Sequence, residues 1–165
     1  MPEKTDIIKL SNELTYQRHL FNREYRKDIF MKISIPEYIA LQYIAMEEAS
    51  NIYSGRTYLK DLANKLQMTM RQVSKMVEKL RDAGYVVWSH DGNGSQGTYV
   101  TITETGQSML KSQEEILKKY YGRVIEKFGE DNLIQLLQLM KQLETVMSSE
   151  MENLEVDVND NGTDE

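Results

Sequence analysis

The sequence of 165 residues is 40% hydrophobic and 28% charged, a composition typical of one globular domain. It has no cysteine, which excludes disulfides, thiolate nucleophiles and cysteine-rich zinc sites, and its two histidines lack metal-binding spacing, so we expect neither metal nor cofactor. Neither a secretory signal nor a stretch of about 18 apolar residues is visible, so we expect a cytoplasmic protein, and the net charge of −6 does not by itself define a partner.

Two helices are predicted in the first third of the chain. Apolar residues recur near helical spacing over residues 4–32, which predicts a long first helix. A second helix is expected over residues 34–51, because Pro36 lies in its first turn and Glu37 follows it.

A compact pair of helices comes next. Residues 59–66, LKDLANKL, place leucine and alanine on one side of a helix. After a two-residue turn, Thr69 and Gln72 have the spacing of a capping box, which predicts a helix over residues 70–82. Gly84 then stands where a left-handed cap belongs.

Two short strands follow these helices. Residues 85–89 and 98–102 are rich in β-branched and aromatic side chains. The eight residues between them, HDGNGSQG, contain three glycines and predict a flexible hairpin tip. Helix, short turn, capped helix and hairpin in this order predict a winged helix-turn-helix over residues 34–102.

The C-terminal part returns to helix. We expect helices over residues 104–128 and 131–153, separated by a turn at Gly129. Between residues 133 and 140, six of eight positions are apolar, too many for one buried face. A partner chain is the simplest second cover, so we predict a homodimer.

The predicted fold class is therefore mostly α with a small β-hairpin wing, flanked by long N- and C-terminal dimerisation helices. Residues 1–153 are expected to form one domain, with residues 4–32 and 104–153 as its dimerisation helices. Residues 154–165 are acidic and contain glycine, which predicts a disordered tail.

The charge of the chain is unevenly distributed. Residues 150–165 hold seven acids and no Lys or Arg, and without those acids the chain has 20 basic and 19 acidic residues, a net charge of +1. Residues 56–82 hold seven basic and three acidic side chains, a local charge of +4. Because a polyanion responds to the field within about 8–10 Å, the acidic total does not exclude nucleic acid.

The segment from Tyr58 to Leu110 resembles the MarR family of bacterial transcriptional regulators. The matching motifs are LxxLAxxL, then VSKMVEKL, then AGYV leading into the wing, and TITETG opening the following helix. With the flanking helices the resemblance covers about 150 residues. The resemblance implies a dimer that binds a palindromic operator, usually as a repressor. It also implies that a small aromatic ligand can release the protein from DNA.

The wing departs from that family's pattern. MarR-like wings usually carry an arginine two residues after an aspartate, reaching the minor groove. Here Asp91 is followed by Gly92 and Asn93, and no Lys or Arg lies between Arg81 and Lys111. Either the wing relies on Asn93, Ser95, Gln96 and backbone amides, or the DNA affinity is weaker than is typical of such regulators. His90 is the one wing residue able to become cationic.

Residues 69–82 are predicted to enter the major groove, where the first turns of such a helix approach base edges. Arg71 is the best candidate for reading guanine, and Ser74 and Lys75 are expected to contact bases or phosphates. Gln72 has two readings, completing the cap or reading adenine. The phosphate contacts are expected from Arg56, Lys60 and Arg81. With Thr69 at the cap, the predicted DNA-contacting residues of this region are Thr69, Arg71, Gln72, Ser74, Lys75, Arg56, Lys60 and Arg81.

A winged-helix protein-interaction module with weak or lost DNA binding is the alternative, motivated by the wing without arginine and the acidic C-terminus. An enzyme is not expected. No nucleophile–base pair or metal spacing is visible, and GNGSQG lies in a hairpin instead of opening a helix.

Overall fold

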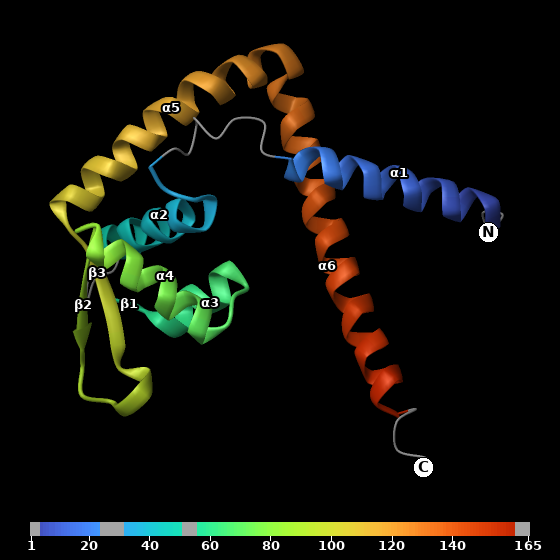
Figure 1. Ribbon diagram of the computed structural model, residues 1–165. Helices are drawn as coiled ribbons and strands as arrows, with labels where there is room; N and C mark the ends of the chain where they lie inside the picture. Colours follow the sequence, from blue (N-terminus) through green and yellow to red (C-terminus); the bar gives the residue numbers. More distant parts are fainter. Residues whose placement is uncertain (1–3, 24–31, 51–55, 161–165) are drawn as a thin grey trace. The chain divides into compact units, whose positions relative to one another are not determined.

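The computed structural model describes residues 4–23, 32–50 and 56–160, and it divides the chain into two compact units, Met1–Ile116 and Leu117–Glu165 (Figure 1). Each unit is described by itself. The described residues are mostly helical with one small antiparallel sheet, so the predicted fold class is confirmed.

The first unit contains the winged helix-turn-helix. Its elements are α1 (Lys4–Asn22), α2 (Ile35–Ser50), β1 (Thr57–Tyr58), α3 (Leu59–Leu66), α4 (Met70–Asp82), β2 (Val86–His90), a 3-10 turn (Gly94–Gln96), β3 (Thr98–Ile102) and the start of α5 (Glu104–Phe128). The first helix is shorter than predicted and ends at Asn22, a residue of low helix propensity. The rest of the prediction for residues 4–32 falls largely on residues 24–31, which lie outside the described residues.

A buried carboxylate joins α2 to α4. The Ser34 amide donates to Glu37 Oε2 at 3.0 Å and the Glu37 amide donates to Ser34 Oγ at 3.3 Å, so these residues form a capping box at the start of α2. Lys79 Nζ on α4 lies 2.9 Å from Glu37 Oε1. The capping residue Glu37 therefore also ties α4 to α2.

The turn between α3 and α4 is short because Gln67 adopts a left-handed conformation with φ of 53°. The Met68 amide then donates to the Ala63 carbonyl at 3.0 Å. This αL cap ends α3 and lets Thr69 begin α4 two residues later.

The end of α4 is fixed by glycine, as predicted. Gly84 has a φ of +82°, and the Tyr85 amide donates to the Leu80 carbonyl at 2.9 Å, which completes a Schellman motif. At the start of α5, Gly106 is packed so closely that a Cβ there would lie 2.1 Å from the Tyr85 carbonyl oxygen. Only glycine fits this contact between the end of α4 and the start of α5.

The sheet has the order β1-β3-β2, with both pairs antiparallel. The two strands of the wing are confirmed within one residue of their predicted bounds. The sequence did not predict β1, because two residues are too short to show an alternating pattern. In the register of β1 with β3, Tyr58 lies opposite Tyr99.

One apolar core joins α2, α3, α4 and the sheet. Its fully buried apolar side chains are Leu41, Ile44, Leu62, Val73, Val77, Leu80 and Val100. The buried stripe of α4 is the stripe predicted from the sequence, so the opposite side of the helix is free for other contacts.

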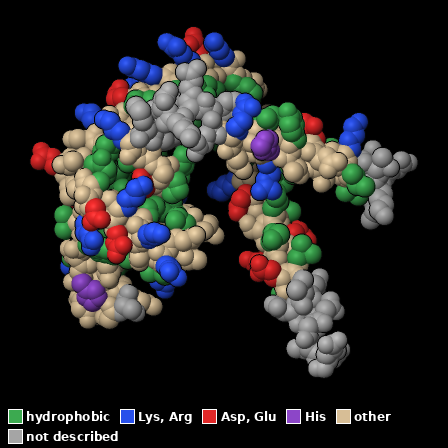
Figure 2. Space-filling model, in the orientation of Figure 1, with side chains coloured by type: hydrophobic (Ala, Val, Ile, Leu, Met, Phe, Trp, Pro, Cys, Tyr) green, Lys and Arg blue, Asp and Glu red, His purple; other side chains and the backbone are tan. Residues whose placement is uncertain are grey.

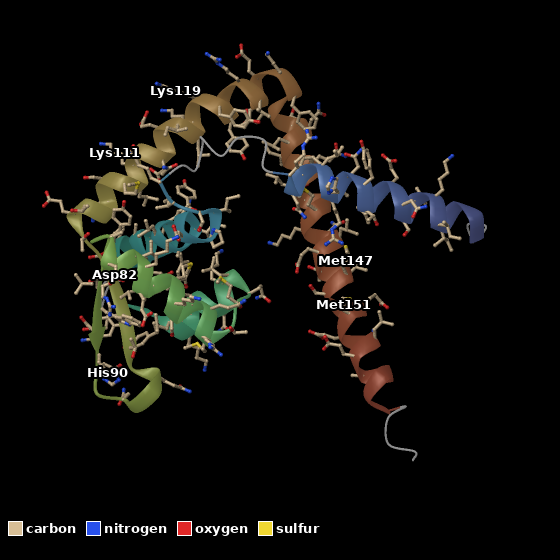
Figure 3. The ribbon with its side chains drawn as sticks, in the orientation of Figure 1. Asp82, His90, Lys111, Lys119, Met147 and Met151 are labelled. Carbon is tan, nitrogen blue, oxygen red and sulfur yellow. The ribbon has the colours of Figure 1, made fainter. Side chains whose placement is uncertain are left out.

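The second unit holds the rest of α5 and all of α6 (Glu130–Asp160). Because α6 continues through Asp160, the prediction of disorder from residue 154 is wrong for residues 154–160. Met147, Met151 and Leu154 continue the helical apolar spacing past Asn153, which explains why the helix does not stop there. Figure 3 shows Met147 and Met151 one turn apart on α6.

Apolar side chains remain exposed on the terminal helices. Phe21 on α1 is 77% exposed and Val146 on α6 is 59% exposed. Among the described residues, no helix is both long and apolar enough to cross a membrane.

Candidate nucleic-acid interface

The start of α4 is held by a reciprocal cap. Thr69 Oγ1 accepts from the Gln72 amide at 3.2 Å, and Gln72 Oε1 accepts from the Thr69 amide at 2.9 Å. Of the two readings of Gln72, the structure shows the capping one. Its side-chain oxygen is bound to the backbone of its own helix.

Two basic side chains follow the cap on the exposed side of α4. Arg71 and Lys75 are exposed, and Ser74 between them is half-buried. Within the described part of the chain, neither cation forms an ion pair with a carboxylate. Both are therefore free to bind an anion.

Met70 is a further candidate contact, one that the sequence analysis missed. It is the first residue of α4 and is 44% exposed, although the other methionine of the helix, Met76, is buried. Its position outside the buried stripe, directly before Arg71, was the available signal. An exposed apolar side chain beside a cation suits a thymine methyl group, which DNA presents in the major groove.

The second half of α4 is acidic. Glu78 and Asp82 are exposed, and Figure 2 shows basic and acidic side chains intermixed over α3 and α4. Figure 3 shows Asp82 at the end of α4 nearest the sheet. An anion is therefore attracted to the first turns of α4 more strongly than to its last turn.

The predicted phosphate contacts differ in what they do within the fold. Lys60 is exposed on α3. The Arg81 guanidinium lies 5.0 Å from the centre of the Trp88 ring and 3.4 Å from Asp82 Oδ1, so it ties the end of α4 to β2.

The wing tip is built around Asp91. Its Oδ1 accepts from the Asn93 amide at 2.8 Å, and its Oδ2 accepts from the Tyr58 hydroxyl at 2.9 Å. A Cβ on Gly97 would lie 2.1 Å from Asp91 Oδ1, so glycine is needed there for the carboxylate to fit. The hydrogen bonds from Asn93 and then Tyr58 lower the pKa of Asp91 below its ordinary value.

His90 is bound within the tip through both ring nitrogens. The Gly92 amide donates to Nδ1 at 2.8 Å, and Nε2 donates to the Gly94 carbonyl at 2.6 Å. With Asp91 also bound, the tip is held by specific hydrogen bonds, and its flexibility stays a prediction.

The other predicted wing contacts are less constrained. The side chains of Asn93 and Gln96 are exposed, and the Ser95 side chain is not among those described. Figure 3 shows His90 on the wing hairpin.

A cation directly before β1 lies against the wing. The Arg56 guanidinium lies 4.6 Å from the centre of the Tyr99 ring, and the rings of Tyr58 and Tyr99 are 5.8 Å apart. Hydrogen bonding to the Tyr58 oxygen, followed by the proximity of Tyr99, raises the pKa of Arg56. The sequence analysis named Arg56 but missed Tyr58, Tyr99 and the role of Asp91. The alternation of Arg56 and Tyr58 along a strand was the one signal available.

No family model matches this sequence, and no curated protein matches it. Solved structures do match. A mutant MarR from E. coli complexed with operator DNA is 15% identical, with a TM-score of 0.65 over 87% of this chain and 99% of the other. The S. aureus MepR–DNA complex is 16% identical, with a TM-score of 0.66 over 81% and 97%. The chain has a MarR-like winged-helix fold.

Other structures of this fold include NadR in complex with 4-hydroxyphenylacetate, which is 19% identical, with a TM-score of 0.53 over 87% of this chain and 92% of NadR. In the MarR-like fold, α3 and α4 form the helix-turn-helix and β2 and β3 form the wing. The motifs quoted for the resemblance thus lie in the elements where the fold requires them. Within the described residues, no group of three or more His, Asp or Glu side chains is placed to hold a metal ion.

Proposed function

We propose that this chain is a sequence-specific transcriptional regulator of double-stranded DNA, acting in the cytoplasm as a homodimer and most simply as a repressor. The observation that carries the proposal is the capped start of α4, where Arg71 and Lys75 are exposed and without ion pairs in the described part of the chain. The cap orients the first turn, and the buried stripe anchors the helix to the core. A mutant MarR and MepR, which share this fold, were both solved in complex with DNA, and this supports DNA as the partner.

The roles follow from this placement. Arg71 has a planar fork that can pair with guanine O6 and N7, and Lys75 and Ser74 follow on the same helix. Arg56 and Lys60 would contact phosphates and set the register without reading sequence. Arg81 would contribute through the field at the end of α4, since Trp88 and Asp82 already hold its guanidinium.

The homodimer rests on the exposed apolar side chains of the terminal helices. On α6 the side chains of Leu137, Leu139 and Met140 are each more than half exposed, and they do not fall on one face. A two-fold partner covering such surfaces would present two copies of α4 about 34–36 Å apart, which predicts half-sites one helical turn apart in a pseudo-palindrome.

The salt dependence of binding tests the proposal. A gel-shift series would use the protein's own upstream promoter fragment and a shuffled fragment of equal length. If the dimer neutralises about 6–10 phosphates, its affinity should fall about 10³–10⁵-fold between 50 and 200 mM salt. A dimeric, folded protein that shows no salt-sensitive shift on any promoter fragment would instead support the protein-interaction module.

Release by a small aromatic ligand is a separate part of the proposal, supported by the NadR complex with 4-hydroxyphenylacetate. The aromatic side chains near the helix junctions include Tyr38 and Tyr43, which pack against the core. A thermal-shift screen with phenolic acids tests this part. A compound that raises Tm and weakens the gel shift supports ligand control, and a panel without effect points to a regulator that needs no ligand.

A further inference from the structure

The wing hairpin has no Lys or Arg of its own, and the side chains of His90 and Asp91 are already hydrogen-bonded. No Lys or Arg lies between Arg81 and Lys111. Both carboxylate oxygens of Asp91 and both ring nitrogens of His90 have hydrogen-bond partners within the wing or on β1. The hairpin alone therefore presents a negative charge where a winged helix meets the DNA backbone.

The register of the sheet brings Arg56 to the wing. Tyr58 lies opposite Tyr99 in the β1–β3 pair, so the two rings share one face of the sheet. Arg56 stands two residues before Tyr58 and lies on that same face. The guanidinium accordingly stacks on the Tyr99 ring, at 4.6 Å from its centre.

This stacking leaves the guanidinium able to bind an anion. A cation–π contact uses the flat face of the group and leaves the N–H donors at its edge available. In the part of the chain that the structure describes, Arg56 forms no ion pair, and the Asp91 oxygens accept from the Asn93 amide and the Tyr58 hydroxyl instead. The Tyr58 hydroxyl donates to Asp91 and its oxygen faces Arg56, so the tyrosine separates the two charges.

We infer that Arg56 is the cation of the wing, binding a DNA phosphate beside the hairpin, with Tyr58, Tyr99 and Asp91 as the positioning residues that hold it there. This inference rests on the proposed function. It assigns to Arg56 the positive charge that the hairpin lacks. The cation is the residue directly before β1, in the segment between α2 and α3, and not part of the hairpin itself.

The experiment measures the slope of affinity against salt concentration for the full chain, on operator and on shuffled DNA. Arg56→Ala removes one phosphate contact per protomer, so the slope should fall by about 2 for a dimer, with similar losses on both DNAs. The affinity difference between 50 and 200 mM salt should then be about tenfold smaller than in the wild type. Arg56→Lys keeps the charge and should retain most of the slope.

Tyr58→Phe tests the positioning role. It removes the hydroxyl between Asp91 and Arg56 but keeps the ring and the cation, so binding should weaken on both DNAs. In the Arg56→Ala background the same change should cause little further loss, since the two residues act through one contact. Lys111→Ala, an exposed cation on α5, is the control and should leave the slope within error.

The outcomes separate the inference from the proposed function. A wild type that binds with a steep salt slope, together with an unchanged slope in Arg56→Ala, overturns the inference and leaves the proposed function standing. A loss in Arg56→Ala confined to operator DNA makes Arg56 a base-reading residue and also overturns it. A wild type without salt-sensitive binding overturns both. Equal Tm values for the variants and the wild type exclude unfolding as the cause of any loss.

Discussion

At the start of α4 the charged side chains are exposed and without ion pairs among the described residues, whereas in the wing the side chains of His90 and Asp91 are bound to backbone groups and to the Tyr58 hydroxyl. Thr69 and Gln72 form the cap that fixes the backbone at the start of the helix. Arg71 and Lys75 take no part in that cap and remain exposed. The hairpin of the wing has no Lys or Arg. The cation beside it, Arg56, precedes β1 and stacks on Tyr99.

This difference teaches that the polar residues of a DNA-binding fold cannot be assigned by type alone. Gln72 and His90 are both residue types that contact DNA, yet both are bound to backbone groups within their own segment. Paired polar groups such as these support the local geometry, and the exposed cations beside them are left available to a partner.

The largest effect is expected for Arg71→Ala. Loss of a bidentate contact to guanine should weaken operator binding by about 1–3 kcal/mol and relax the sequence preference at one position of each half-site. Competition gel shifts with single-base operator variants measure both quantities.

Lys111→Ala is the matched control, because it removes an exposed cation on α5 (Figure 3). If Arg71→Ala instead weakens operator and shuffled DNA equally, Arg71 contacts phosphate and the base-reading role passes to other residues of α4.

Gly97→Ala should break the wing tip. The added Cβ would lie 2.1 Å from Asp91 Oδ1 and 2.9 Å from the Asn93 amide nitrogen. The Asp91 carboxylate would therefore have to move away from its present position. Overpacking of this kind costs about 1–3 kcal/mol, measured as a lower free energy of unfolding in urea.

Gly122→Ala is the control, since a Cβ there meets nothing within 4 Å and lies inside α5. It should stabilise the protein by about 0.5–1 kcal/mol. If Gly97→Ala and Gly122→Ala change the free energy of unfolding equally and with the same sign, the stability of the tip does not depend on the position of the Asp91 carboxylate.

Local sequence signals predicted the helix-turn-helix and the strands well. The capping box at Thr69, the αL position of Gly84 and the buried stripe of α4 each depend on residues within one or two turns, and each is confirmed. The end of α6 was misjudged because acidic composition outweighed an apolar spacing that continues to Leu154.

The wing network could not be predicted in the same way. Tyr58 and Asp91 are 33 residues apart in the sequence, and only the pairing of β1 with β3 brings them together. A two-residue strand carries no periodicity, so neither the hydrogen bond nor the position of Arg56 was visible before the sheet was known. The absence of Lys and Arg from the hairpin was visible in the sequence alone.

Thr69→Ala should lower the free energy of unfolding by about 1 kcal/mol, because the Gln72 amide loses its side-chain acceptor. Thr69→Ser keeps a hydroxyl and should retain most of the stability. Gln72→Ala should cost less, and its effect on DNA binding should be the same for operators with and without adenine at the contacted positions. A stability unchanged by Gln72→Ala, combined with a lost adenine preference, would restore the reading in which this side chain reads bases.

Met70→Ala should remove a contact to a thymine methyl group. Replacing the contacted thymine with uracil deletes that methyl, and burial of one such group is worth about 0.8 kcal/mol, or about fourfold in affinity. The wild type should lose this factor on uracil-substituted operator, and Met70→Ala should show no further loss. Met46→Ala, at a 62% exposed methionine on α2, is the control and should keep the full sensitivity to uracil. A uracil effect that persists in Met70→Ala would assign the methyl contact to another residue.

The smallest effect concerns the pH dependence of stability, and it arises from Asp91. The hydrogen bonds from the Asn93 amide and the Tyr58 hydroxyl lower the pKa of this carboxyl in the folded state, so the unfolded state takes up the proton first as pH falls. The stabilisation is therefore fully present above the unfolded value of about 3.9 and is lost as the pH drops through the lower folded value.

Asp91→Asn should be less stable than the wild type at pH 7, and the difference should narrow below about pH 4 as the wild-type carboxyl becomes protonated. Urea midpoints across the acid range measure this convergence. Tyr58→Phe should narrow the gap in part, because it removes one of the two hydrogen bonds and leaves the bond from Asn93 in place. Parallel curves of urea midpoint against pH for the wild type and Asp91→Asn would mean that these bonds do not distinguish the charged from the neutral carboxyl. The wing tip would then be stabilised by the His90 ring and Gly97.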